Sequence, residues 1–159
     1  MATTFTTELE AVNTMLSAVG TSPVSTITGS VGADVSMATN ILEEIRREVL
    51  SRGWAFNYEK EVELTPDGDN IITLAENVLR IDSAPGFNLN LDLVQRGTSL
   101  YDKKAHTTTI TESKVTVNIM YHLEWTALPE AARRYMMVRA ARIFADRLVG
   151  YNHQHAFSM

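Results

Sequence analysis

The chain has 159 residues, of which 45% are hydrophobic and 21% charged, and it contains no cysteine. This composition is ordinary for one globular domain with a buried core, and it excludes a disulfide framework, a catalytic thiolate and a cysteine-bound zinc. The net charge of −5 disfavours a general nucleic-acid binder. No apolar run approaches the roughly 18 residues of a membrane span, and the sequence shows no secretion signal, so folding in the cytosol is expected.

Two helices are predicted in the first third of the chain. Thr7 and Glu10 have the spacing of a capping box, and apolar residues then follow at helical intervals to about residue 19. A loop rich in Thr, Ser and Gly covers 21–32. Asp34 is the expected N-cap of a second helix, which has one apolar stripe and one charged face and ends near residue 52, before Gly53.

The hydrophobic period changes to two after Gly53, which predicts a β-rich antiparallel portion over about 56–121. Its first strand carries the alternating acids Glu59, Glu61 and Glu63. Gly, Pro, Ser and Thr clusters separate the further strand candidates, which are Ile71–Leu74, Val78–Asp82, Leu89–Gln95, Ser99–Lys103 and Lys114–Met120. The polar tract 106–114 is either an exposed hairpin or a mobile loop.

A third helix is predicted from Pro129, which suits a first helical turn, to about residue 149, with Gly150 closing it. Apolar residues cover nearly half of its circumference, so it needs contacts on two sides. The fold class is therefore α+β: a small bundle of three long helices, about 7–52 and 129–149, with the β-rich portion inserted between the second and third. We interpret 1–159 as a single domain.

The junction between the second helix and the first strand contains Trp54 and Phe56. On an extended segment these rings point to the same side, where they could fill a seam between helices and sheet or form a stacking platform for nucleic-acid bases. The acids that follow would repel a phosphate backbone, so the seam is favoured, and Trp54→Ala is expected to disrupt folding.

The third helix is basic within an acidic protein. Its five arginines against Glu130 and Asp146 give +3, and the rest of the chain must carry −8 to reach the net −5. Arg139 and Arg142, at i,i+3, could hold phosphate, with Arg133 and Arg134 extending the patch. Asp146 lies on the same face, which favours salt bridges to a neighbouring surface, and Arg139, Arg142 and Asp146 are the predicted subunit-interface residues.

The sequence predicts no catalytic residue, cofactor or metal ion. It contains no Gly-rich phosphate loop, no G-x-S-x-G elbow and no HExxH motif. The three strand acids could form an acid/base pair or a Ca²⁺ patch, but such residues are more often the solvated face of an edge strand. His153 and His155 could bind a metal only with a third ligand from elsewhere. Two alternatives stay open: a small nucleic-acid-binding protein using the 133–147 arginines, and a hydrolase or carbohydrate-binding module.

Several sequence blocks together carry a resemblance to a known family. They are "ELEAVNTMLSAVGTSPVSTITG", "IRREVLSRGWAFNYE", "QRGTSLYD", "VTVNIM" and "LPEAARRYMMVRAARIFADRLVG". In order and spacing, from about residue 7 to 150, they resemble the tail tubular protein A family of short-tailed bacteriophages. No generic helical pattern demands the Val-Gly-x-x-Pro-Val loop or the Arg-Gly-Trp-x-Phe-Asn junction.

The resemblance implies a structural protein of the virion and no enzyme. Members of that family are head-to-tail adaptors. They assemble as a ring, typically of twelve copies, beneath the portal protein; the ring carries the tail nozzle protein below it, and its lumen belongs to the DNA ejection channel. DNA is expected to pass through without specific binding, and assembly is expected in the host cytoplasm with no membrane partner. The family fold, a helical bundle with a β-rich insertion, agrees with the elements predicted above.

Overall fold

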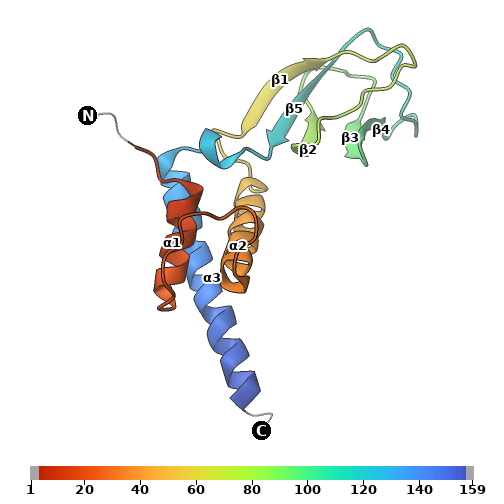
Figure 1. The fold of residues 1–159 in the computed structure, drawn as a ribbon. Helices are drawn as coiled ribbons and strands as arrows, with labels where there is room; N and C mark the ends of the chain where they lie inside the picture. Colours follow the sequence, from red (N-terminus) through yellow and green to blue (C-terminus); the bar gives the residue numbers. More distant parts are fainter. Residues whose placement is uncertain (1–3, 157–159) are drawn as a thin grey trace. The chain divides into compact units, whose positions relative to one another are not determined.

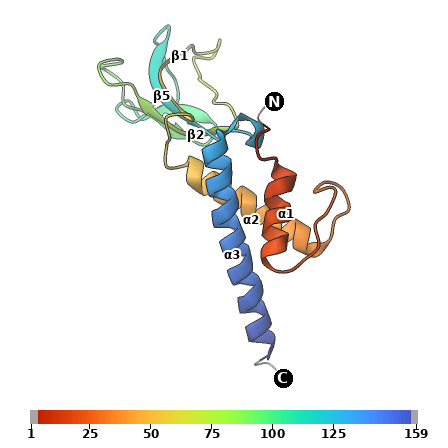
Figure 2. The ribbon, with the colours of Figure 1, turned by 90° about the vertical axis from the view of Figure 1, so that its left-hand side faces the viewer.

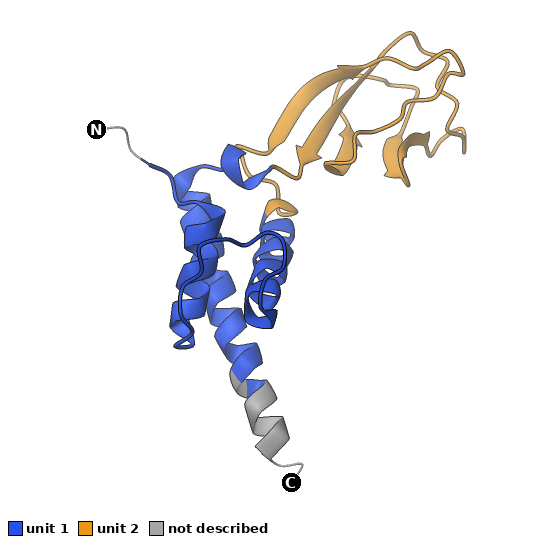
Figure 3. Cartoon of the chain, viewed as in Figure 1, with its two compact units in different colours: residues 1–49, 124–159 blue, residues 50–123 orange. Residues whose placement is uncertain are grey.

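The chain folds into three α-helices and a five-stranded antiparallel sheet, and its class is α+β. The structure, a computed structural model, describes residues 4–156, and of Val149 and residues 151–156 it describes the backbone only. Two compact units are present (Figure 3). The helical unit combines residues 1–49 with 124–159, and the sheet unit comprises 50–123. Within the helical unit, α1 packs along the first half of α3 (Figure 1 and Figure 2).

The first helix, α1, spans Glu8–Ala18 and begins with the predicted capping box. The Thr7 hydroxyl accepts a hydrogen bond from the Glu10 backbone N–H at 3.1 Å, and the Glu10 carboxylate accepts one from the Thr7 N–H at 2.7 Å. Both groups satisfy N–H donors that a helix start leaves without partners. One face of the helix is buried, and its members are Ala11, Val12, Met15 and Leu16.

The second helix, α2, spans Ala33–Leu50 and buries the predicted apolar stripe. It starts one residue before Asp34, so this acid lies in the first turn and not at the N-cap. There its negative charge still opposes the positive end of the helix dipole. Gly53, with φ of +75°, follows the last turn.

The third helix, α3, spans Glu130–Ala156 and follows a short 3₁₀ turn, η1, at Trp125–Ala127. Its buried face comprises Arg133, Met136, Met137, Ala140 and Phe144. The predicted stop at Gly150 is wrong, because the helix continues through this residue to Ala156. Gly150 does not take the positive φ of a terminating glycine, and a helical glycine weakens a helix by only about 1 kcal/mol.

The sheet has the strand order β1-β5-β2-β3-β4, and every neighbouring pair is antiparallel. Its strands are β1 (Tyr58–Leu64), β2 (Val78–Ser83), β3 (Leu93–Arg96), β4 (Ser99–Asp102) and β5 (Val115–Tyr121). The long strand β5 pairs on both sides and is buried over 115–120. An apolar cluster from all five strands and the segments beside them forms the core of this unit.

Three β predictions differ from the structure. Residues 71–74 are no strand and form one bridge, Thr73 with Ser99, although Ile72 and Leu74 are buried. Strand β3 begins at Leu93, because the preceding residues form a loop. The tract 106–114 is irregular, and its Ile110 is buried and donates its backbone N–H to the Asn70 carbonyl at 2.8 Å.

Candidate functional site

The Trp54–Phe56 pair lies in a turn that precedes β1, and not on the extended segment predicted from its spacing. The two rings are nevertheless stacked, with centroids 6.4 Å apart and planes 7° from parallel. Trp54 is 43% exposed. A hydrogen bond from the Asn57 N–H to the Trp54 carbonyl at 3.0 Å closes the turn. The predicted role of the two rings in a seam between helices and sheet stays a prediction.

Asn57 is the buried anchor of this turn, and sequence reasoning missed it. Its side-chain oxygen accepts the Trp54 N–H at 2.7 Å, and its amide group donates to the carbonyls of Leu50 at 2.9 Å and Tyr121 at 2.8 Å. One 1%-exposed side chain therefore joins the last turn of α2, the turn before β1 and the end of β5. The Leu50 carbonyl lies at a helix C-terminus, where the carbonyls lack intrahelical partners.

Arg133 has a structural role and does not belong to the phosphate patch that the sequence predicted. Its guanidinium is buried and donates to the carbonyls of Leu128, Thr6 and Thr126 at 2.9, 3.1 and 2.8 Å. Glu130 accepts from both the Thr6 N–H and the Thr6 hydroxyl, and these two bonds lower the pKa of its carboxyl. The segment before α1 is thereby fastened to the start of α3.

Two further arginines of α3 pair with acids of α2 in the same chain. Arg139 Nη2 lies 2.5 Å from Glu48 Oε1. Arg147 forms a bidentate pair with Glu44, in which Nη2 donates to Oε1 at 2.9 Å and Nη1 donates to Oε2 at 3.0 Å. The hydrogen bonds from Arg147 lower the pKa of Glu44, and hydrogen bonding to the Tyr135 hydroxyl and the Glu48 carboxylate helps raise the pKa of Arg139. Much of the basic character of this helix is therefore balanced within the chain.

An exposed stripe runs along the side of α3 that lies opposite its buried face. We define the α3 stripe as Tyr135, Val138, Arg142 and Asp146, whose spacing of three or four residues places them on one helical face. Tyr135 is 46% and Val138 52% exposed. Arg142 forms no ion pair with any side chain that the structure describes.

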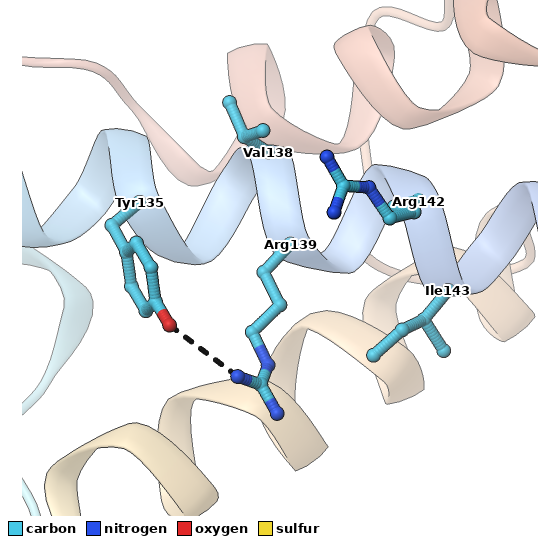
Figure 4. Close-up of a pocket in the computed structure, with 5 residues that line it drawn as sticks. All are labelled: Tyr135, Val138, Arg139, Arg142 and Ile143. Carbon is cyan, nitrogen blue, oxygen red and sulfur yellow. Dashed lines mark hydrogen bonds between the residues drawn. The ribbon is translucent and has the colours of Figure 1, made fainter.

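A shallow hollow of about 370 Å³ lies on this surface, which we call the α3 hollow. It is lined by Tyr135, Val138, Arg139, Arg142 and Ile143. Figure 4 shows the five side chains along one side of α3, with the Tyr135 hydroxyl toward the Arg139 guanidinium at 3.3 Å. The hollow thus combines apolar surface with guanidinium donors.

The structure places the three predicted interface residues on this side of α3. Arg142 and Asp146 are exposed members of the stripe, whereas Arg139 is partly buried beside it and already bonded to Glu48. The exposed Val138 was not predicted from the sequence. The signal in the sequence for this exposed position was a valine among the polar residues of one helical face.

The acids of β1 do not form the regular row that their alternation predicted. A bulge between Glu59 and Val62 interrupts the strand, where Glu61 adopts φ of +57° and donates its N–H to the Asn118 side chain at 3.0 Å. Glu63 is bonded to Lys114. No group of three possible metal ligands occurs among the described residues, and the side chains of His153 and His155 lie outside them.

Comparison with protein families identifies the family of the chain. The model of the family described as tail tubular protein matches residues 9–158. The chain belongs to the tail tubular protein family. No curated protein matches the sequence.

A member of the tail tubular protein family is a structural component of a phage tail, and its place is the virion. None of the helices in the described part of the chain is long and apolar enough to cross a membrane. For such a component, a partly apolar helix face with both charge signs is a candidate contact surface for protein.

Proposed function

We propose that the chain is a head-to-tail adaptor of a short-tailed phage. About twelve copies form a ring that joins the portal of the head to the tail nozzle, and the lumen of the ring belongs to the DNA ejection channel. The three helices act in this proposal as a bundle, with the sheet unit inserted between α2 and α3. Membership of the tail tubular protein family supports it, as do the sequence blocks that resemble the adaptors.

The observation that carries the proposal is the exposure of the α3 stripe. Tyr135 and Val138 expose apolar surface beside Arg142, while the other side of the same helix is buried in its own unit. Tyrosine and arginine are enriched at protein–protein contacts, and contiguous exposed apolar surface rimmed by polar residues is a mark of such contacts. We assign the stripe to the contact between neighbouring copies, with Arg139, Arg142 and Asp146 within or beside it.

A ring needs a contact in which two different surfaces of the same chain meet. The α3 stripe carries both Arg142 and Asp146, so its partner surface need not be strongly acidic. This differs from the simplest expectation that acids of the next copy neutralise the whole basic helix, because Glu48 and Glu44 of the same chain already neutralise Arg139 and Arg147.

The alternative function, nucleic-acid binding through the arginines of α3, is disfavoured because most of these guanidinium groups are already bonded within the chain. Arg133 is buried on three carbonyls, and Arg139 and Arg147 are held by glutamates. Only Arg134 and Arg142 stay exposed without an ion pair among the described residues. Two isolated cations on an acidic protein suit a channel through which DNA passes without being bound.

The experiment is negative-stain electron microscopy of the full chain, alone and with the portal protein of the same phage. We expect rings on the portal for the wild type and none for the double variant Val138→Glu, Arg142→Glu. Asn40→Glu, at an exposed position of α2, is the matched control and should assemble normally. Circular dichroism establishes that each variant is folded. Folded wild-type chain that forms no ring with the portal refutes the adaptor function.

A further inference from the structure

The loop between β2 and β3 displays two large apolar side chains to solvent. We call residues 84–91 the tip loop; it follows the green strand β2 in Figure 1. Phe87 is 44% exposed, and Leu89 is 79% exposed, the highest value among the large hydrophobic residues exposed in the described chain. The segment 84–90 carries no charged residue. Surface of this kind on a soluble chain suits contact with another protein.

The tip loop is fixed in this conformation by hydrogen bonds to the sheet. Asn88, with φ of +50°, donates from its side chain to the Thr116 carbonyl at 2.5 Å and accepts the Thr116 N–H at 3.1 Å. Lys104 Nζ donates to the Leu89 carbonyl at 2.9 Å. Because Thr116 belongs to β5, which is paired with a strand on each side, the loop is held to the sheet while Phe87 and Leu89 stay exposed to water. A binding element that is already ordered loses little conformational entropy on docking.

Several other exposed hydrophobic residues already have partners in the chain. The Phe5 ring lies under the Arg133 guanidinium at 4.9 Å, and Trp54 stacks on Phe56. Two groups of neighbouring exposed hydrophobic residues then stand out: Phe87 with Leu89 on the tip loop, and Tyr135 with Val138 on α3. They differ in form, since one is a loop with two exposed side chains and the other borders a hollow.

We propose that the tip loop of one copy docks into the α3 hollow of the next copy in the ring. This inference rests on the proposed ring, and it names the two surfaces that meet there. A head-to-tail contact requires two dissimilar, complementary surfaces on one chain, and the tip loop and the hollow form such a pair.

The size and the polarity of the two surfaces are complementary. The hollow, about 370 Å³, is at the small end of binding pockets and suits a pair of side chains better than a helix or a strand. Its polar groups include the guanidinium of Arg142, which can only donate hydrogen bonds. The tip loop brings acceptors to it, namely backbone carbonyls and the exposed amide of Asn90.

The test is disulfide trapping, which the absence of native cysteine makes free of background. A tagged Leu89→Cys chain is mixed with an untagged Val138→Cys chain, with the portal protein present, and oxidised. Because each chain has one thiol, a product combining one tagged and one untagged chain reports a contact between copies. The control replaces Val138→Cys by Met37→Cys, a 39% exposed position on α2.

We expect the mixed Leu89–Val138 dimer as the main product and no mixed dimer with the control. We also expect the folded double variant Phe87→Asp, Leu89→Asp to lose ring assembly, while the control Asn40→Glu on α2, outside both surfaces, keeps it. Rings that form without the mixed dimer, or that form from the Asp variant, overturn the docking but leave the adaptor function standing. Failure of the wild-type chain to form rings removes both.

Discussion

Asn57 is expected to contribute more to folding than the neighbouring Trp54. Asn57→Ala removes three hydrogen bonds and leaves the Leu50 and Tyr121 carbonyls and the Trp54 N–H without their partners. A buried polar group left unsatisfied loses about 1–3 kcal/mol, so we expect the free energy of unfolding to fall by roughly 3–6 kcal/mol. That is a large share of the ~5–15 kcal/mol that stabilises a typical domain.

Trp54→Ala removes a smaller interaction. The ring is 43% exposed and stacks on Phe56, so we expect a loss of about 1–2 kcal/mol from stacking and partial burial. This revises the expectation from the sequence that Trp54→Ala disrupts folding.

Urea unfolding followed by far-ultraviolet circular dichroism measures both variants without relying on tryptophan emission. Asn90→Ala, which truncates an exposed asparagine, is the control and should stay within about 0.5 kcal/mol of the wild type. The reasoning is refuted if Asn57→Ala lies within about 1 kcal/mol of the wild type, or if Trp54→Ala proves the more damaging change.

Three more predictions concern stability. Burial acts to raise the pKa of the Asp102 carboxyl, but N–H donors of Asp92, Lys104 and Ala105 outweigh it and lower that pKa. The ionised carboxylate therefore stabilises the folded chain above the ordinary aspartate pKa of about 4, and this stabilisation is lost as pH falls through the depressed value. In urea titrations Asp102→Asn should thus be less stable at pH 7 by about 2–4 kcal/mol, and the difference should shrink below about pH 4; a constant difference contradicts this. Arg133→Lys removes the planar guanidinium that donates to three carbonyls, so it should lower the melting temperature and the free energy of unfolding, the latter by about 2–4 kcal/mol. Arg134→Lys, at an exposed position, should leave both unchanged. Gly53→Ala meets both a φ of +75° and Met120 Cε at 2.6 Å and should lose about 1–2 kcal/mol, whereas an alanine at Gly68 has open space; equal losses at the two glycines refute the strain argument.

The elements that the sequence predicted well are those specified by neighbouring residues. The capping box of Thr7 and Glu10 acts within one turn, and the apolar stripe of α2 follows from helical spacing alone. Gly150 shows the limit of such signals, because a glycine permits a helix to end without requiring it. The strand pattern of β1 likewise could not reveal the bulge at Glu61, which depends on Asn118 of a neighbouring strand.

The residues that sequence reasoning missed act over long distances along the chain. Asn57 bonds a carbonyl 64 residues away, Asn88 bonds β5 across 28 residues, and Arg133 reaches Thr6 across 127. Their local sequence contexts resemble those of exposed polar residues, so only the folded chain shows that they are anchors. The contact surface was also only partly predictable. Helical spacing placed Arg142 and Asp146 on one face, but the solvent-exposed part of that face is defined by the exposure of Val138 and by the pairing of Arg139 with α2.

The adaptor ring is tested most directly by the mass of the complex between the full chain and its portal, measured by mass photometry. We predict an added mass of about twelve chains of 17.7 kDa each for the wild type, and none for the folded Val138→Glu, Arg142→Glu variant. A wild-type chain that adds no mass to the portal contradicts the adaptor function. A double variant that adds the full mass contradicts the assignment of the α3 stripe to the contact between copies.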